Sequence, residues 1–344
     1  MDKSFLYNRN TFGIRLFSCL VLLVPSVKDM ETGREGENIR DRDAACHRDH
    51  LGEKLWDDDF RIVEIKSGID GHIQRAYFYR AKAEGPRPLV VSLHTWSGSY
   101  SQADEIAELS RERGVHYIHP DFRGPNTTVD ACCSALALND IDEAISWAML
   151  HASVDTSKIY MIGVSGGGYA TLSAFMKSKH PVKRFSAWAS ITDLAAWYDE
   201  CRIRQYKYAD DILRCTGSDT LALNIPAAKG RSPLYWPTPV PKLDDAVVFI
   251  YAGIHDGVTG SVPITHSINF YNKLLADLGV TDSMSYVSGF ETKNLLLTRQ
   301  PLGDFGHIGS RRICLRKDHG NIRLVIFDGG HEMLADFAFA ELMQ

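Results

Sequence analysis

The sequence predicts an α/β protein with a doubly wound, mostly parallel β-sheet. Short apolar stretches alternate along the chain with longer stretches whose apolar residues recur at helical spacing. The apolar stretches are continuous rather than alternating, as expected for strands that helices cover on both faces. With 344 residues, 44% of them hydrophobic and 24% charged, the chain can build the large core that this architecture needs.

The elements follow from these patterns in chain order. An antiparallel hairpin is expected first, because residues 61–66 and 72–80 are β-rich and the turn sequence Ser67–Gly71 separates them. Apolar runs such as PLVVSL then predict strands at residues 88–93, 115–119, 158–164, 185–191, 246–252 and 322–327. Helical spacing predicts helices at residues 103–113, 136–151, 167–177, 263–278 and 331–342.

Two stretches interrupt this alternation, at about residues 197–243 and 281–320. The first is rich in Tyr, Arg, Pro and Trp, and the second is polar. Insertions after strands commonly lie over the carboxyl edge of such a sheet, where ligands bind. Both are therefore predicted to be inserted loops that wall a site at that edge.

The N-terminal region has the pattern of an export signal. An apolar run, Leu16–Val27, follows the basic residues Lys3, Arg9 and Arg15 and is too short to span a bilayer. We expect a signal peptide over residues 1–26 with cleavage near Ser26, a charged leader over 27–55, and a single domain over 56–344. The protein is then secreted or periplasmic, with no stable membrane insertion after cleavage. A buried N-terminal helix or a membrane anchor is the alternative.

Charge and cysteine content exclude other classes. Lys and Arg number 38 against 43 Asp and Glu, so no basic field for nucleic acid is expected. No cysteine or histidine cluster has zinc spacing, and we expect neither a metal nor a cofactor. Of seven cysteines, Cys19 lies in the predicted signal, and the other six allow 15 pairings. Cys201 and Cys215, which flank a polar stretch, are the preferred pair, whereas the neighbours Cys132 and Cys133 are unsuited to bond each other.

The strongest chemical motif is Gly163-Val164-Ser165-Gly166-Gly167, which lies between an apolar strand and a helix. This G-x-S-x-G pattern in a strand–turn–helix context is typical of a nucleophile elbow, in which a sharp turn lifts a serine hydroxyl off the sheet. Gly163 and Gly167 leave room for the turn, because a Cβ at either would collide with the neighbouring helix or strand. A purely structural glycine turn is the alternative.

A serine hydroxyl needs a base, and the base needs an orienting carboxylate. Asp256 follows the strand 246–252 and His331 follows the strand 322–327, in the order that this motif requires. Each residue alone also has a structural interpretation, Asp256 as a turn residue and His331 as the N-cap of the last helix. Asp193 and Asp328 are competing carboxylates, but the first is expected to cap a helix and the second to support His331. We therefore predict the triad Ser165, Asp256 and His331.

An oxyanion formed at Ser165 needs two N–H donors. The first is the backbone of Gly166, directly after the nucleophile. The second is expected in the stretch Leu93–Gly98, with Trp96 preferred and Thr95 next. The Trp96 ring is also a candidate acyl-pocket wall or sugar-stacking platform, or an ordinary core residue.

These motifs resemble those of the α/β-hydrolase superfamily over roughly residues 60–344. The stretches LHTWSG, DFRG, GVSGGGY and DGGHEM, with V-P-x-x-x-S-x-x-F after Asp256, are similar to catalytic domains of the prolyl oligopeptidase-like group. The resemblance implies an α/β-hydrolase-type sheet and a serine hydrolase whose triad is Ser165, Asp256 and His331. That group spans peptidases, acyl transferases and carbohydrate esterases, so the resemblance leaves the substrate open.

Prolyl oligopeptidases resembling this group carry a long N-terminal propeller, which this sequence lacks before its hairpin. This favours a single-domain carbohydrate esterase that removes acetyl or methyl esters from a polysaccharide. A glycan is then the expected partner, and Arg123, Trp197 and Tyr198, together with Trp96, are candidate substrate-binding residues. A prolyl-oligopeptidase-like serine peptidase is the alternative. An inactive glycan-binding homologue is the second alternative.

Overall fold

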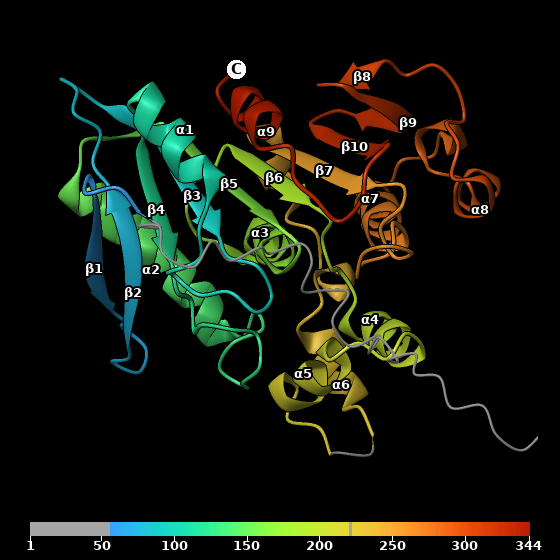
Figure 1. The fold of residues 1–344 in the computed structure, drawn as a ribbon, viewed down its shortest axis with the longest axis horizontal. Coiled ribbons are helices and arrows are strands. Elements are labelled where there is room, and N and C mark those ends of the chain that lie inside the picture. The colour runs from blue at the N-terminus through green and yellow to red at the C-terminus, as the bar shows by residue number, and fades with distance from the viewer. Residues whose placement is uncertain (1–55, 220–221) are drawn as a thin grey trace, which may run out of the picture. The chain divides into compact units, whose positions relative to one another are not determined.

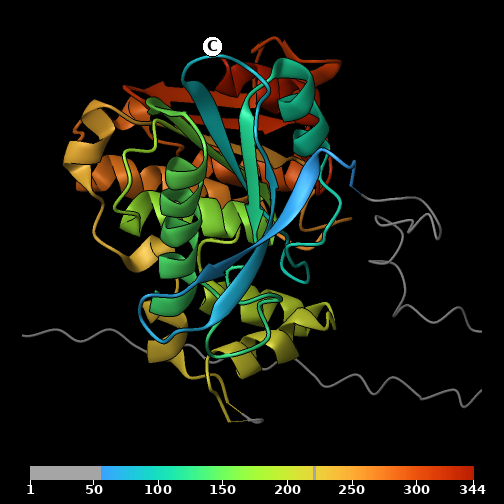
Figure 2. The same cartoon turned by 90° about the vertical axis from the view of Figure 1, so that its left-hand side faces the viewer.

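The computed structural model describes residues 56–219 and 222–344. The predicted signal peptide and charged leader lie outside the described residues. Within the described part, a ten-stranded sheet is flanked by helices on both faces (Figures 1 and 2). The predicted fold class is therefore confirmed.

The spatial order of the strands is β1-β2-β4-β3-β5-β6-β7-β10-β9-β8. The predicted hairpin is present, β1 and β2 pairing antiparallel from Phe60↔Tyr79 to Lys66↔Ile73. In this spatial order, the six strands β4-β3-β5-β6-β7-β10 all run parallel to their neighbours, so their carboxyl ends lie along one edge of the sheet. The bounds are β1 Phe60–Lys66, β2 Ile73–Tyr79, β3 Arg87–Leu93, β4 His116–Pro120, β5 Val154–Val164, β6 Arg184–Trp188, β7 Val247–Gly253, β8 His307–Ile308, β9 Arg311–His319 and β10 Ile322–Phe327.

The faces of the sheet build two apolar cores. In β3, Leu89 and Val91 join the core that contains α2, α3 and α7, while Val90 points to the other face, where α1 and α9 pack. These fully buried neighbours explain why the strand sequence reads as a continuous apolar run. The helices are α1 Glu105–Arg113, α2 Ala135–His151, α3 Gly166–Lys177, α7 Thr265–Asp277 and α9 Ala335–Leu342. None of the helices in the described part of the chain is both long and apolar enough to cross a membrane.

The first insertion is helical. It contains α4 Leu194–Ile203, α5 Tyr208–Cys215 and α6 Ile225–Gly230, followed by the 3-10 helices η2 Pro233–Tyr235 and η3 Val240–Asp244. Figure 1 shows α4, α5 and α6 beyond the ends of the central strands. The predicted position over the carboxyl edge therefore agrees with the structure, although the expected loops are short helices.

The second insertion contains two strands that the sequence did not predict. Its η4 Ser283–Ser285 and α8 Gly289–Thr298 lead to β8 and β9, and β9 pairs antiparallel with β10 from Ile322↔His319 onward. The strands of this stretch extend the sheet sideways (Figure 1). Arg299, the C-cap of α8, also reaches the carboxyl edge, where it donates to the carbonyl of Ile254 at 2.7 Å, close to the loop of Asp256. Charged residues in β9, with only Ile313, Cys314 and Leu315 buried in succession, conceal the strand in the sequence.

A buried histidine in β4 predicts acid sensitivity. His119 is 1% exposed, and burial lowers its pKa to about 4, although the Asp104 carboxylate 3.7 Å from Nδ1 acts in the opposite sense. Its unfolded pKa is near 6.5, so between pH 6.5 and 4 the unfolded chain binds the extra proton and stability is lost as pH falls.

We expect acidification from pH 7 to 4.5 to remove about 2–3 kcal/mol of unfolding free energy through this residue. Urea unfolding at both pH values measures the loss. His119→Gln should reduce the difference in unfolding free energy between pH 7 and pH 4.5 by that amount, whatever the effect of this substitution on stability at pH 7. An unchanged difference would assign the acid sensitivity to other groups.

Candidate active site

Ser165 occupies the sharp turn between β5 and α3. Its backbone has φ 58° and ψ −119°, a conformation that L-residues rarely adopt. The N–H of Ser165 donates to the carbonyl of Trp188 in β6, at 2.8 Å, which ties the turn to the next strand. Strain of this kind, held by the surrounding sheet, is typical of a functional position.

The glycines around Ser165 are required by close backbone packing. A Cβ at Gly163 would lie 2.4 Å from the carbonyl carbon of Gly167, and one at Gly167 would lie 2.1 Å from the Leu93 oxygen. Backbone atoms cannot move aside as flexible side chains can. The structure therefore gives both glycines the steric role that the motif predicts.

The two predicted oxyanion donors lie on adjacent backbone segments. A Cβ at Gly166 would come within 2.2 Å of the Trp96 backbone nitrogen, so the loop after β3 runs directly against the first residue of α3. The N–H of Thr95 donates to Gln102 Oε1 at 3.0 Å. This engagement favours Trp96 over Thr95 as the second donor, beside Gly166.

Gly166→Ala is expected to lower kcat at least 10²-fold, the usual cost of losing one oxyanion donor. The added methyl group must displace the Trp96 backbone, which lies at contact distance. Steady-state kinetics on a chromogenic substrate measure the loss. Gly230→Ala is the matched control, because a Cβ there meets nothing within 4 Å. Comparable kcat values for the two variants would contradict the assignment of this backbone as the oxyanion site.

Asp256 lies in the loop after β7 and its side chain is completely buried. One carboxylate oxygen, Oδ1, accepts hydrogen bonds from the N–H groups of Gly257, at 2.8 Å, and Val262, at 3.0 Å. The other, Oδ2, is 2.7 Å from Nδ1 of His331. Two fixed backbone donors thus hold the carboxylate with one oxygen aimed at the imidazole.

The loops that carry Asp256 and His331 are bound to each other. The N–H of His255 donates to the carbonyl of Gly329 at 3.0 Å, and a Cβ at Gly253 would meet the Gly330 oxygen at 2.2 Å. Gly260 fits between the two side chains, since a Cβ there would lie 2.5 Å from both Asp256 Oδ1 and His331 Cβ. The Asp–His contact is therefore built by interlocked backbone.

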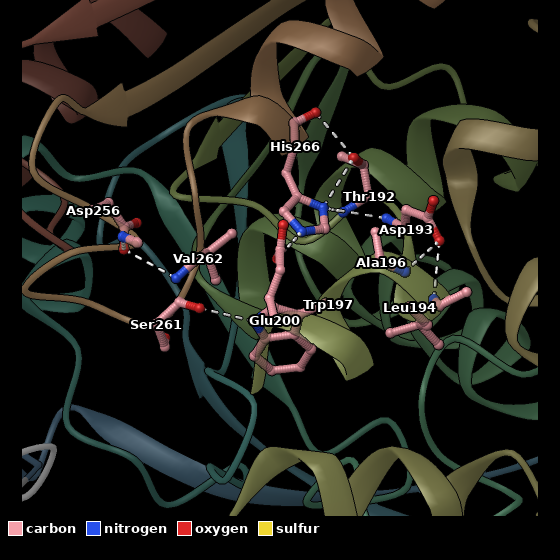
Figure 3. Close-up of polar contacts among 12 residues, drawn as sticks. Thr192, Asp193, Leu194, Ala196, Trp197, Glu200, Asp256, Ser261, Val262 and His266 are labelled. Carbon is pink, nitrogen blue, oxygen red and sulfur yellow. Dashed lines mark hydrogen bonds and ion pairs between the residues drawn. The ribbon is translucent and has the colours of Figure 1, made fainter. Parts of the chain in front are cut away.

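Side chains of α4 and its C-cap secure the loop after Asp256. The guanidinium of Arg204 donates to the carbonyls of Gly257, Gly260 and Ser261 at 2.9–3.0 Å. The indole N–H of Trp197 also donates to the Ser261 carbonyl, at 2.9 Å, as Figure 3 shows. Hence the first insertion positions the loop on which the predicted acid lies.

His331 lies in the loop after β10, before α9. The predicted helix 331–342 begins only at Ala335, with Leu334 as its N-cap, so His331 is not a cap. Its side chain is 23% exposed, and its Nε2 lies 3.5 Å from the hydroxyl of Ser261. With Nδ1 bound to Asp256, Nε2 is the nitrogen left to exchange a proton with a nucleophile.

The structure thus brings Asp256 and His331 into contact and places Ser165 at the same edge of the sheet. Ser165 follows β5, Asp256 follows β7 and His331 follows β10, within the parallel run β5-β6-β7-β10. This arrangement suits acyl transfer, in which His331 would take the Ser165 proton and Asp256 would orient the imidazole.

The candidate substrate-binding side chains are engaged in the protein interior. The Arg123 side chain is 5% exposed and pairs with Asp70, at 2.8 Å, and with Asp140, at 2.7 Å. Burial also removes Trp197 and Tyr198 from solvent. The Arg123 guanidinium is thus paired within the protein, and the buried rings of Trp197 and Tyr198 form no exposed stacking surface.

Trp96 is likewise buried, which excludes an exposed stacking platform. Its indole N–H donates to Asp211 Oδ2 of α5 at 3.1 Å, and its ring packs edge-on against Trp197 at 4.7 Å between centroids. The structure therefore places this ring in the core, which is one of the alternatives that the sequence left open. Only the backbone of Trp96 faces Gly166.

The competing carboxylates have other partners. Asp193 caps α4, accepting from the N–H groups of Ala195 and Ala196, and Tyr235 donates its hydroxyl hydrogen to it at 2.6 Å. Asp328 is exposed and lies 3.2 Å from Nε2 of His255. The predicted cap is therefore confirmed, while Asp328 supports the neighbouring loop through His255.

Several residues around the site carry no sequence signal. The contacts of Arg204 with the Asp256 loop, of Ser261 with His331 and of Asp211 with Trp96 form only through folding. Nearby, His266 of α7 accepts at Nδ1 from the Thr192 N–H, at 3.1 Å, and its Nε2 lies 3.0 Å from Glu200 Oε2 (Figure 3). These contacts join residues 53 to 115 positions apart, so no local pattern could reveal them.

No protein-family model matches the chain. Among solved structures, it is similar to Pyrococcus horikoshii acylaminoacyl peptidase, with 19% identity and a TM-score of 0.51 over 64% of this chain and 35% of that one. A Mycobacterium tuberculosis puromycin-hydrolyzing peptidase is 15% identical, with a TM-score of 0.54 over 82% of this chain and 37% of that one. Prolyl oligopeptidase B from Galerina marginata is 16% identical, with a TM-score of 0.51 over 64% of this chain and 32% of that one.

The chain spans about a third of the length of these proteins. In the sheet of this chain, β5 lies near the centre of the parallel run, and β7 and β10 are neighbours. Taken with the strand–turn–helix geometry at Ser165, this likeness shows that the chain has an α/β-hydrolase-type fold.

Proposed function

We propose that this chain is a serine hydrolase that cleaves its substrate through an acyl-enzyme on Ser165. The hydrogen bond of 2.7 Å between His331 Nδ1 and the buried carboxylate of Asp256 is the observation that carries the proposal. This bond fixes the imidazole tautomer with the proton on Nδ1, which leaves Nε2 as a base.

The reaction proceeds in two stages. The Ser165 hydroxyl attacks the substrate carbonyl while His331 Nε2 accepts its proton, and the N–H groups of Gly166 and Trp96 stabilise the oxyanion. His331 then returns the proton to the leaving group. Water repeats the sequence on the acyl-enzyme and releases the acid, which regenerates Ser165.

For the substrate we favour an amide, in the form of an acylated or free aminoacyl compound. The fold likeness to an acylaminoacyl peptidase and a puromycin-hydrolyzing peptidase supports this class. The polysaccharide-ester hypothesis has less support, since Trp96, Trp197 and Tyr198 are buried rather than arranged to stack on sugars. Export to a periplasmic or extracellular location stays part of the proposal.

A substrate panel distinguishes these classes. N-acetyl-aminoacyl and free aminoacyl p-nitroanilides are compared with acetylated and methyl-esterified polysaccharides, and nitroaniline, acetate and methanol are each measured. We expect anilide cleavage that Ser165→Ala abolishes. Acetate or methanol release at a higher kcat/KM than any anilide would establish the esterase instead. Failure of a fluorophosphonate to label Ser165 in folded protein would favour an inactive, glycan-binding protein.

The activity should also depend on pH in one direction. Because the base must be a neutral imidazole, kcat/KM is expected to fall by up to tenfold per pH unit as acid protonates His331. The measurement is kcat/KM on the best substrate from pH 4 to 8. A rate that stays constant down to pH 4 would contradict a histidine base.

A further inference from the structure

Two buried cysteines from distant parts of the chain meet beside the site. Cys132 lies in the segment between β4 and α2, and Cys215 is the last residue of α5. Both side chains are fully buried, and their sulfur atoms are 2.7 Å apart. The sequence favoured Cys201 as the partner of Cys215, whereas the structure places the Cys215 sulfur against that of Cys132.

The backbone at Cys132 is held for this contact. Its N–H donates to Asn126 Oδ1 at 2.8 Å, and its carbonyl accepts from the Tyr169 hydroxyl at 3.0 Å. Residue 132 has φ 55°, an uncommon value for a residue with a side chain. On the other side, α5 places Cys215 at its end, so both sulfurs are carried by backbone with fixed partners.

The pair also closes a ring of contacts around Trp96. On one side, Asp211 of α5 accepts the indole N–H of Trp96. On the other, the Asn126 N–H donates to the Trp96 carbonyl at 2.9 Å, and Asn126 in turn holds Cys132. Joining Cys132 to Cys215 would therefore lock both partners of the residue whose N–H is the proposed second oxyanion donor.

We propose that Cys132 and Cys215 form a disulfide that fastens α5 to the segment before α2. The oxidant is a low-molecular-weight disulfide such as oxidised glutathione. One cysteine thiolate attacks it, forms a mixed disulfide and releases one thiol. The second cysteine thiolate then attacks the mixed disulfide, forms the Cys132–Cys215 bond and releases a second thiol. The two cysteine protons end on the released thiols, so the protein pair is oxidised as the reagent is reduced.

Burial favours formation of this bond during folding rather than after it. In the folded chain, burial raises the pKa of the Cys132 thiol well above its ordinary value, which suppresses the attacking thiolate. The same burial shields a completed bond from reductants. Because 83 residues separate the cysteines, the link also restricts a long stretch of the unfolded chain.

Peptide mapping of the full chain tests the proposal without any enzymatic assay. The protein is refolded in a glutathione redox buffer, denatured with iodoacetamide and digested without reductant. We expect a cross-linked peptide pair containing Cys132 and Cys215, lighter by two hydrogens than the two free thiol peptides. The adjacent residues supply matched variants, since Cys133→Ser should keep the cross-link and Cys132→Ser should abolish it.

Thermal melting provides a second measurement. Protein that is unfolded, reduced with a phosphine and refolded in its presence should melt on the order of 5 °C below the oxidised protein, for the wild type and for Cys133→Ser. This difference in Tm should be lost in Cys132→Ser. Alkylation of both Cys132 and Cys215 after oxidative refolding, or a cross-link that joins either to another cysteine, would overturn the proposal. A correct cross-link whose reduction leaves Tm unchanged would overturn its fastening role.

Discussion

Ser165→Ala is expected to lower kcat/KM by about 10⁵- to 10⁶-fold, because no other group can form the acyl-enzyme once the hydroxyl is removed. The change keeps the Cβ and the backbone at φ 58°, so the fold should persist. Kinetics on the best substrate measure the loss, and an unchanged Tm shows that the fold is intact. Fluorophosphonate labelling should disappear together with activity.

Ser261→Ala is the matched control for this experiment. The Ser261 hydroxyl lies 3.5 Å from His331 Nε2, so it is a second serine within reach of the base. It does not occupy the strained turn at the start of α3, where the Gly166 N–H follows the nucleophile. We expect its variant to keep activity within about tenfold, since a hydrogen bond of ordinary strength contributes only 0.5–1.5 kcal/mol. A greater loss at Ser261 than at Ser165 would reverse the assignment of the nucleophile.

Asp256→Asn should reduce kcat by about 10⁴-fold, the effect of this change in a Ser-His-Asp triad. The carboxamide can turn its NH₂ group toward His331 Nδ1, which then becomes the acceptor and moves the ring proton to Nε2. That nitrogen can no longer take the Ser165 proton. The loss is expected in kcat more than in KM, because the imidazole acts in the transition state rather than in substrate binding.

The control for Asp256 is Asp328→Asn. Asp328 is also a carboxylate on the His331 loop, but it is exposed and lies beside His255. Removing an exposed pair of this kind usually costs less than about 1 kcal/mol. Its variant should therefore retain kcat within a few-fold. If Asp328→Asn proves the more damaging change, the orienting acid has been misassigned.

Much of the architecture was predictable because it depends on local patterns. The apolar runs of β3 and β7 and the helical spacing of α2 each reflect burial on a particular face, and burial restricts residue type. β9 was missed because it lies near the sheet edge, where charged residues such as Arg316 and Lys317 are tolerated. The start of α9 was predicted at residue 331 instead of Ala335, because the Gly-Gly-His stretch before it has no strong signal for where a helix begins.

The sequence alone placed Ser165, Asp256 and His331 at strand ends, because parallel connections bring the carboxyl ends of strands to one edge whatever lies between them. Only the tertiary structure decided that Asp256 meets His331 at 2.7 Å, that Arg204 holds the acid loop, and that Cys215 faces Cys132. It also buried Trp197 and engaged Arg123 in ion pairs. Contacts between residues so distant in the chain depend on how whole elements pack, and local sequence carries no record of that packing.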